Sequence, residues 1–278
     1  MKKKLQRLFI VLILIFTNSI YAQKLETIKG SKMVTLSEIE LDSVSSIELF
    51  KGVNLILKKG DTYKLNIYAD DNLHDVLDID LNKGKLSLSL MKRIIRKKEF
   101  ELTLFTPNLN EIILDDNSSL TNNDFFDVSN LNVILNNKAE LNCFFNGDII
   151  IFEGNDTSKS KSTFKAESIV YNLKDRSQVI NVSNSSITKM NIAGRSHIEL
   201  SGKSNETFIE SFQTSNLKLT NLISEITEII AEDKTTIYTN TKNDLTISAK
   251  DDCKIYIYGK AEIDLIDFKD EATLYKKE

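Results

Sequence analysis

The stretch Ile192-Ala-Gly-Arg-Ser-His-Ile198 is the clearest copy of a seven-residue phrase that recurs through the second half of the chain. The phrase reads apolar, any, turn residue, any, small, any, apolar. The other copies span residues 114–120, 135–141, 152–158, 173–179, 211–217, 231–237, 249–255 and 268–274, with 152–158 and 211–217 the weakest. Successive copies begin 17 to 21 residues apart. A nearly constant period of about 20 residues is the signature of a stacked repeat.

Two positions of the phrase have a direct physical interpretation. The third position, here named the turn column, holds residues that tolerate left-handed backbone and favour turns. It contains Asp116, Asn137, Gly154, Asp175, Gly194, Gln213, Asp233, Asp251 and Asp270. The fifth position, the small column, lets coils stack closely or points into a narrow interior. It contains Ser118, Ala139, Asp156, Ser177, Ser196, Ser215, Thr235, Cys253 and Ala272.

The apolar positions that flank these columns must build a core shared between coils, because one coil cannot bury its own apolar face. The sequence therefore predicts an all-β fold, a single-stranded parallel β-helix or solenoid with coils of about 19 residues. Residues 107–278 would form about nine such coils. Pro107 marks their beginning, since proline cannot donate a ladder hydrogen bond and favours a strand end.

The N-terminal part of the chain is also β-rich but does not carry the phrase cleanly. Residues 44–106 alternate apolar and polar side chains with the strand period of two. We expect residues 23–106 to form irregular strands at the start of the same sheet, closing one end of the core. A helical turn is expected only at residues 73–77.

The first 22 residues have the layout of a secretory signal peptide. Lys2, Lys3, Lys4 and Arg7 precede an apolar run at residues 8–16, and cleavage is expected after Ala22. Because Ile20 is not ideal three residues before the cleaved bond, an uncleaved anchor remains an alternative. No later segment has the length of a membrane helix. The protein is therefore predicted to be exported, to the periplasm, the outer-membrane surface or the extracellular space.

Charge argues against a nucleic-acid partner. Signal cleavage removes four positive charges, so 36 Lys and Arg become 32 against 40 Asp and Glu, a net charge of −8. A general nucleic-acid binder needs a basic face.

The two cysteines, Cys143 and Cys253, are expected to be free. The repeat places them six coils apart, which at about 4.8 Å per coil is roughly 29 Å. A disulfide needs Cα atoms within about 7 Å. Both are predicted to be buried thiols that act as small apolar residues.

The repeated phrase, with its signal peptide and alternating N-terminal half, resembles the head GIN family of auto-transporter adhesins, which are exported proteins found largely in Bacteroidetes. The resemblance extends over residues 44–278 and includes the segments 50–57, 85–88 and 102–109. The turn glycine of the family is present at Gly154 and Gly194, and Asp or Asn mostly replaces it elsewhere. The resemblance implies a β-helix-like fold at the cell envelope.

No catalytic constellation, metal site or cofactor motif emerges from the sequence. His74 and His197 lack further ligands at metal-binding spacing, and the glycines fit neither a phosphate-binding loop nor a dinucleotide fingerprint. An acidic row on the turn edge could bind a cation or resemble the carboxylates of solenoid polysaccharide lyases and hydrolases. That row is Asp115, Asp116, Asp175, Asp233, Asp251 and Asp270. Turn chemistry alone explains it, since an acid–base pair must converge in one place.

One basic run stands out, formed by Lys92, Arg93, Arg96, Lys97 and Lys98 and interrupted by Ile94 and Ile95. It is interpreted either as a solvated loop between strands or as a contact for an anionic ligand, such as an acidic glycan or a lipopolysaccharide phosphate.

Three functions are compatible with these features. The first is a non-catalytic envelope module, adhesin-like, that recognises a glycan or a protein along one solenoid face. The second is a carbohydrate-active enzyme, a polysaccharide lyase or hydrolase, on the same scaffold. The third is a structural envelope spacer.

Overall fold

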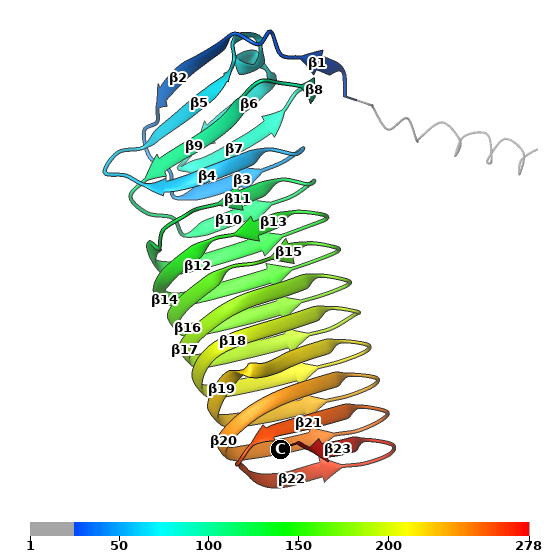
Figure 1. Cartoon of the computed structure of the whole chain (residues 1–278). Helices are drawn as coiled ribbons and strands as arrows, with labels where there is room; N and C mark the ends of the chain where they lie inside the picture. Colours follow the sequence, from blue (N-terminus) through cyan, green and yellow to red (C-terminus); the bar gives the residue numbers. More distant parts are fainter. Residues whose placement is uncertain (1–24, 278) are drawn as a thin grey trace, which may run out of the picture.

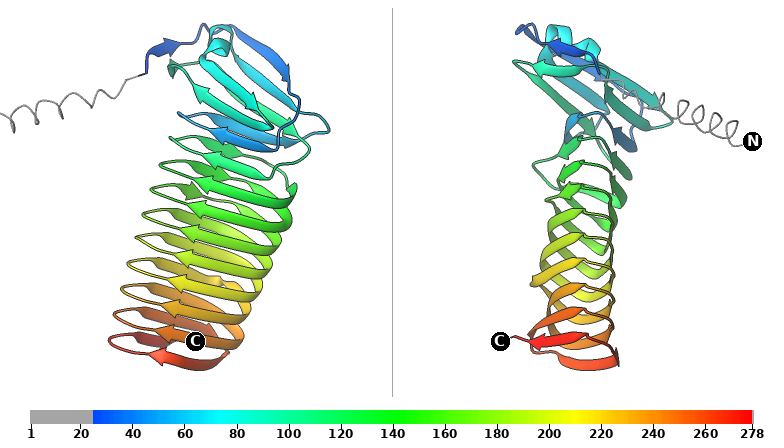
Figure 2. Two further views of the ribbon diagram at one scale, coloured as in Figure 1. Left: turned by 180° about the vertical axis from the view of Figure 1, so that it is seen from behind. Right: turned by 90° about the vertical axis from the view of Figure 1, so that its right-hand side faces the viewer.

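The computed structural model describes residues 25–277, and the predicted signal peptide at 1–22 lies outside them. The chain forms a long column of stacked coils, with a twisted group of strands covering its N-terminal end (Figure 1, Figure 2). About nine solenoid turns are present, so the predicted all-β solenoid is confirmed. No helix within residues 25–277 has the length and apolarity needed to cross a bilayer.

The N-terminal strands and the single 3-10 helix of the described residues have the following bounds. They are β1 (Thr27–Lys29), β2 (Val34–Glu40), β3 (Ser46–Leu49), β4 (Asn54–Lys59), β5 (Lys64–Asp70), η1 (Asp71–Val76), β6 (Leu77–Asn82), β7 (Lys85–Leu90), β8 (Arg93–Arg96) and β9 (Phe100–Thr106). The helix η1 overlaps the helical turn expected at residues 73–77.

The solenoid strands follow. They are β10 (Glu111–Leu114), β11 (Ser119–Thr121), β12 (Phe126–Leu135), β13 (Glu140–Asn142), β14 (Phe144–Gly154), β15 (Lys159–Ser160), β16 (Thr163–Leu173), β17 (Gln178–Ile192), β18 (His197–Ser211), β19 (Asn216–Ala231), β20 (Thr236–Ala249), β21 (Lys254–Gly259), β22 (Glu262–Phe268) and β23 (Thr273–Lys276).

Successive coils pair in parallel, and equivalent residues of the phrase meet in two continuous ladders. The first ladder is Leu114, Leu135, Gly154, Leu173, Ile192, Ser211, Ala231, Ala249 and Phe268. The second is Leu120, Leu141, Ser160, Val179, Ile198, Leu217, Ile237, Ile255 and Leu274. The apolar side chains of both ladders point inward and join the core of the column, together with the buried residues of the longer strands, such as Phe145, Phe164 and Ile229.

The small column also faces the interior, and most of its members are buried. Ser118, Ser177, Ser196, Ser215 and Thr235 are all at most 1% exposed. Their hydroxyls find partners inside the column: Ser177 Oγ donates to Ser196 Oγ at 3.3 Å, and Ser215 and Thr235 hydroxyls lie 3.1 Å apart. In these five coils a small hydroxyl therefore fills the narrow end of the coil and still satisfies its hydrogen bond.

One assignment in the repeat was wrong. Gly154 is not a turn residue, because it pairs with Leu135 and Leu173 in the first ladder and is buried. The left-handed residue of this coil is Asp156, with φ of 55°. The phrase therefore runs over residues 154–160, two later than expected. The error arose because Gly154 and Ser160 occupy the first and seventh positions of the phrase in this coil, which are apolar in most other copies. A Cβ on Gly154 would lie 2.9 Å from Leu173 Cδ2, so neighbouring side chains already fill its space.

The solenoid begins earlier than the phrase suggested. Strand β3 pairs with β10, matching Leu49 with Leu114, and β4 pairs with β11, matching Leu55 with Leu120. Residues 46–59 therefore form a coil whose turn is Lys51–Gly52, with φ of 51° and 79°. The phrase was not recognised there because Val53 replaces the small residue and Lys51 the usual turn residue.

Two more strands stack on that first coil from the N-terminal side. β7 pairs in parallel with β3, and β9 pairs in parallel with β4. The segment joining β7 to β9 thus takes the place of a turn, and it contains β8 and the basic run. Antiparallel partners complete the end: β6 pairs with β7, and β2 and β9 flank β5.

We expect Gly202→Ala to lower the free energy of unfolding by about 3 kcal/mol. Gly202 has φ of 121°, and a Cβ there would lie 2.2 Å from the Ser183 carbonyl oxygen. Gly52→Ala is the control, because Gly52 has φ of 79° but open space around its Cβ position. It should cost only about 1–2 kcal/mol, the strain of left-handed backbone. Urea unfolding measures both, and equal losses would show that the close approach of the Ser183 carbonyl to Gly202 adds no cost to a side chain there.

Both cysteines are free and buried, at 0% exposure. Burial raises the pKa of the Cys143 thiol and of the Cys253 thiol, so neither forms the reactive thiolate near neutral pH. An aromatic disulfide reagent at pH 8 should therefore detect no thiol in the native protein and two after unfolding in urea. Fewer than two thiols in the unfolded, unreduced protein would reveal an intramolecular disulfide and refute the coil spacing.

Candidate functional site

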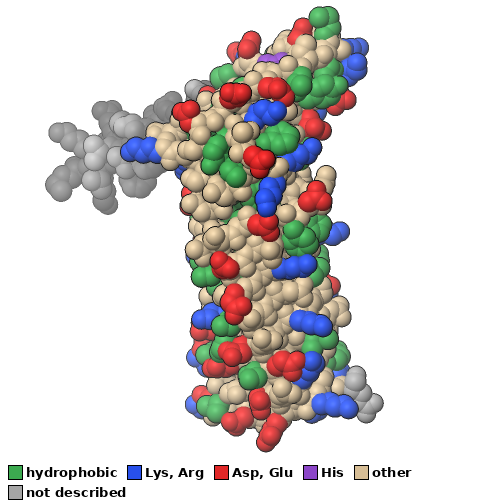
Figure 3. Space-filling model, turned by 90° about the vertical axis from the view of Figure 1, so that its left-hand side faces the viewer, with side chains coloured by type: hydrophobic (Ala, Val, Ile, Leu, Met, Phe, Trp, Pro, Cys, Tyr) green, Lys and Arg blue, Asp and Glu red, His purple; other side chains and the backbone are tan. Residues whose placement is uncertain are grey.

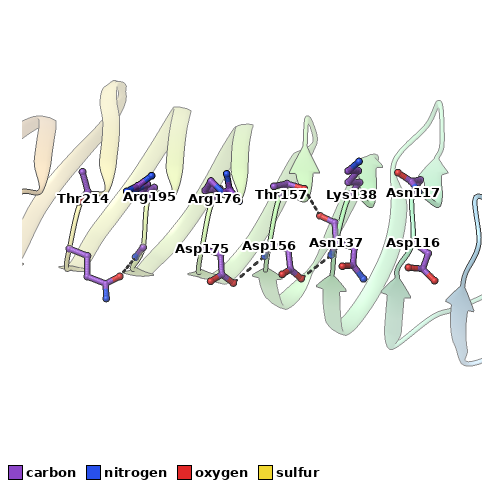
Figure 4. A pocket seen from close by; sticks show the side chains of 12 residues that line it. Asp116, Asn117, Asn137, Lys138, Asp156, Thr157, Asp175, Arg176, Arg195 and Thr214 are labelled. Atoms are coloured by element: carbon purple, nitrogen blue, oxygen red, sulfur yellow. Dashed lines mark hydrogen bonds between the residues drawn. The ribbon is translucent and has the colours of Figure 1, made fainter. Parts of the chain in front are cut away.

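The turns of the solenoid lie along one edge of the column and form its most regular surface. The turn column residues with a left-handed backbone are Asp116, Asn137, Asp156, Asp175, Gly194, Gln213, Asp233, Asp251 and Asp270, with φ between 49° and 76°. The next residue of each turn forms a second row beside them, here named the tip row. Figure 4 shows both rows side by side across six coils.

Acidic and amide side chains of the turn column bind the coil before them. In six of the turns a side-chain oxygen accepts a hydrogen bond from the backbone N–H of the preceding turn residue. The pairs are Asp156 Oδ2 with Asn137 N (3.0 Å), Asp175 Oδ2 with Asp156 N (3.2 Å), Gln213 Oε1 with Gly194 N (2.6 Å), Asp233 Oδ2 with Gln213 N (2.9 Å), Asp251 Oδ2 with Asp233 N (3.3 Å) and Asp270 Oδ2 with Asp251 N (3.4 Å).

This ladder changes the expected role of the acidic row. Stacked carboxylates repel one another, and this repulsion alone would direct the side chains into solvent. The side chains are exposed, yet in these six turns the side-chain oxygen is directed toward the preceding coil, where it accepts a hydrogen bond from a backbone N–H. Charge-assisted hydrogen bonds of this kind offset the repulsion between neighbouring carboxylates. Asp at this position therefore serves two local purposes, the left-handed turn and the link between coils.

A groove of about 940 Å³ runs along this edge. Its charged lining consists of Asp116, Asp156 and Asp175 from the turn column and Lys138, Arg176 and Arg195 from the tip row. Its remaining lining includes Asn117, Asn137, Thr157, Gln213 and Thr214. Three positive charges face three negative ones, so the groove is close to neutral and rich in hydrogen-bonding groups. Among residues 25–277, none of the three cations lies within 4.0 Å of a carboxylate.

Most of the basic run lies in a second cavity, of about 650 Å³, at the N-terminal end of the same edge. Lys92, Arg93, Arg96 and Lys97 line it, together with Asp116 and Asn117, which also line the turn-edge groove. Lys98 is not among its lining residues. Four of the five residues named as an anionic-ligand contact are thus brought together.

The loop that carries Lys97 and Lys98 is held by a buried carboxylate, Asp70. Its oxygens accept hydrogen bonds from the backbone N–H groups of Lys32, Lys98 and Glu99, at 3.1–3.3 Å. Burial raises the pKa of Asp70, but these three donors and the nearby Lys98 charge outweigh it and hold the pKa below its ordinary value. The charged form of Asp70 therefore fixes the backbone at the base of the basic run.

Residues that could carry catalysis or a metal do not converge. His74 Nε2 lies 2.9 Å from Thr35 Oγ1 at the N-terminal end, whereas His197 lies 4.0 Å from Glu199 in the middle of the column. Across residues 25–277, no group of three or more His, Cys, Asp or Glu side chains is placed to hold a metal ion.

An aromatic ladder near the C-terminal end was not identified from the sequence. Tyr238, Tyr256 and Tyr275 stack face to face, with ring centroids 4.6 and 4.7 Å apart. Their spacing of 18 and 19 residues matches the repeat, and this periodicity could have revealed them. The Tyr256 ring covers one face of Tyr238 and one face of Tyr275. The ladder therefore offers mainly ring edges and hydroxyls rather than open faces on which a sugar could stack.

Asp233→Ala tests the ladder of the turn column. The substitution removes the acceptor for Gln213 N–H and a residue that tolerates left-handed backbone, so unfolding should become easier by about 1–2 kcal/mol. Asp233→Asn keeps both properties and should change stability by less than about 0.5 kcal/mol. Urea titration gives both values. If alanine were as well tolerated as asparagine, the side-chain link between coils would have no energetic role.

Comparison with known proteins agrees with this architecture. A family model described as "Putative auto-transporter adhesin, head GIN domain" matches residues 44–261. No curated protein sequence matches the chain.

Several solved structures share the fold at low sequence identity. A "putative adhesin" from Parabacteroides merdae ATCC 43184 superposes with a TM-score of 0.61 and 13% identity, covering 91% of this chain and 100% of that one. A "putative adhesin" from Parabacteroides distasonis ATCC 8503 gives 0.65 and 12%, with the same coverage. A "putative lipid binding protein" from the same P. distasonis strain gives 0.53 and 12%, again with this coverage. Identities this low establish a common fold and nothing finer.

The family match covers the first coil, the enlarged turn with the basic run and nearly all later coils. It extends over most of the chain and agrees with the resemblance seen in the repeated phrase. The chain therefore belongs to the head GIN domain family of putative auto-transporter adhesins.

Proposed function

We propose that this protein is a non-catalytic, adhesin-like module of the cell envelope that holds an extended glycan along its turn edge. The observation that carries the proposal is the turn-edge groove, in which hydrogen-bonding side chains recur once per coil (Figure 4). Membership of an adhesin family supports a binding role. Export, directed by residues 1–22, to the periplasm, the outer-membrane surface or the extracellular space is part of the same proposal.

The repeat of the groove suits a polymer. Coils follow one another at about 4.8 Å, so equivalent donors and acceptors form a row with that spacing. A glycan also presents hydroxyl groups at regular intervals along its length, and it can satisfy several coils at once. Each single contact is worth little in water, but contacts along six coils act together.

The charge balance of the groove indicates what kind of glycan it would hold. Lys138, Arg176 and Arg195 are matched by Asp116, Asp156 and Asp175. A polyanion would be repelled by the three carboxylates and a polycation by the three basic groups, and either repulsion would weaken binding. A neutral glycan, which accepts hydrogen bonds from Arg and Lys and donates them to Asp, avoids both.

The other two functions receive less support. A lyase or hydrolase needs an acid and a base placed on either side of one bond. The turn-column carboxylates instead lie in a row, and most of them accept a backbone N–H. A pure spacer does not require a groove of this size. On the edge opposite the turns, charged side chains of both signs are dispersed among polar ones, with small groups of hydrophobic side chains between them (Figure 3).

A glycan array with the mature chain tests the proposal. Neutral glycans should be retained, and the double variant Arg176→Gln/Arg195→Gln should bind about tenfold more weakly, because two charge-assisted donors are lost. Lys161→Gln/Lys203→Gln is the matched control, since both lysines are exposed and neither lines the groove. Its affinity should equal that of the unsubstituted protein.

Three results would overturn the proposal. The first is an array without a retained glycan, or with binding that the Arg176→Gln/Arg195→Gln variant does not weaken. The second is the release of reducing ends or unsaturated products from a bound glycan, which would identify an enzyme. Retention of an envelope protein in place of any glycan would likewise move the function to a protein partner.

A further inference from the structure

The turn that joins β7 to β9 is the exceptional turn of this column. Leu88 and Leu102 are the equivalents of Leu49 and Leu55 in the first coil. Residues 89–101 therefore replace the short connection 50–54. Because no coil stacks on the far side of this turn, it can enlarge without disturbing the column, and it forms the parallel pair β1–β8 (Figure 1).

A β-bulge in that pair brings two arginines together. Thr27 pairs with Arg93 and Lys29 with Arg96, and the register shifts between Ile28 and Lys29. Thr27 and Lys29 are two residues apart, so they lie on one face of β1. Their partners therefore share a face although they are three residues apart, which a regular strand does not allow.

The cavity below the arginines is cationic. Lys51, Lys92, Arg93, Arg96 and Lys97 line it, against one carboxylate, Asp116, at the end where it meets the turn-edge groove. Lys92 is paired with Glu26 at 3.1 Å. Within residues 25–277, Lys51, Arg93, Arg96 and Lys97 have no carboxylate within 4.0 Å. These four charges are therefore available to a ligand.

The same cavity is also apolar, unlike the turn-edge groove. Leu25, Leu90, Ile94, Ile95 and Phe100 contribute to its lining. Ile95, the extra residue of the bulge, is 46% exposed, and Leu25 is 36% exposed. Lys97 Nζ lies 5.5 Å from the centre of the Phe100 ring. A purely ionic site has no need of this exposed hydrocarbon, which costs free energy unless something covers it.

We propose that this cavity, which we name the bulge pocket, binds a single anionic amphiphile, with a phosphate at Arg93 and Arg96 and a hydrocarbon portion over Ile95, Leu25 and Phe100. Guanidinium groups match phosphate oxygens in pairs, and two on one face can bind one phosphate together. The cavity volume of about 650 Å³ is that of a site for one small molecule.

Other anions fit the bulge pocket less well. An acidic glycan lacks the apolar portion that would cover Ile95 and Leu25. A long polyanion would have to continue along the turn edge, where Asp116, Asp156 and Asp175 oppose it. The ligand therefore has one compact anionic group beside a short apolar segment, as a phospholipid does. The bulge pocket goes beyond the proposed glycan function and does not depend on it.

Calorimetric titration of the mature chain with dihexanoyl phosphatidic acid, kept below its micelle concentration, tests the proposal. Saturable binding of one molecule per chain is expected. Dihexanoyl phosphatidylcholine, with the same chains and no net charge, and inorganic phosphate, with the charge and no chains, should each bind at least about tenfold more weakly. These two arms separate the contributions of the charge and of the hydrocarbon.

Variants then assign the binding to the bulge pocket. Arg93→Gln/Arg96→Gln should weaken phosphatidic acid binding by about tenfold or more, and Ile95→Ser should weaken it while leaving the response to inorganic phosphate unchanged. Arg176→Gln/Arg195→Gln, the glycan variant, should bind phosphatidic acid like the unsubstituted protein, so the failure of one proposal is distinguishable from the failure of the other. All affected side chains except Ile95 are charged and exposed, and thermal unfolding checks each fold.

The proposal is overturned if phosphatidic acid does not bind, or if inorganic phosphate binds as tightly as phosphatidic acid. It is equally overturned if Arg93→Gln/Arg96→Gln and Ile95→Ser both bind phosphatidic acid with unchanged affinity.

Discussion

The parallel hydrogen bonding of each coil to the next, which aligns equivalent residues of the repeated phrase, is the constraint on which the whole structure depends. It brings equivalent residues of the phrase into contact from coil to coil, as in the ladder from Leu114 to Phe268. A position that suits one coil must therefore suit its neighbours. Apolar side chains build a shared core in this way, small hydroxyls fill the narrow interior, and tyrosines stack.

The same constraint decides the chemistry of the turn edge. Each turn from Asp116 to Asp270 contains a left-handed residue of the turn column, and the backbone N–H of that residue lies at the surface. In six turns an Asp or Gln of the next coil accepts a hydrogen bond from this N–H, so the acidic row first links the coils. The tip-row side chains do not accept these backbone hydrogen bonds, and the row includes Lys138, Arg176 and Arg195. A neutral, polar groove results from the two rows together.

At the N-terminal end, the last turn has a neighbouring coil on one side only. The turn after β7 has no further coil above it, so residues 89–101 can leave the column, pair with β1 and carry a bulge. Asp70 accepts hydrogen bonds from the backbone N–H groups of Lys98 and Glu99 and so fixes the C-terminal part of this segment. Charge and exposed hydrocarbon therefore gather in the bulge pocket, whereas a turn inside the stack has space for only a few residues.

The sequence by itself determined the period, the solenoid and the family, because these features repeat locally and each copy confirms the others. Only the tertiary structure decided that the column starts at β3, that Asp156 replaces Gly154 in the turn column, and that Leu25, Lys51, Arg93 and Asp116 line one cavity. Alternation along a strand reveals which face is buried but not which strand is its neighbour. Contacts made once, between segments far apart in the chain, leave no periodic trace in the sequence.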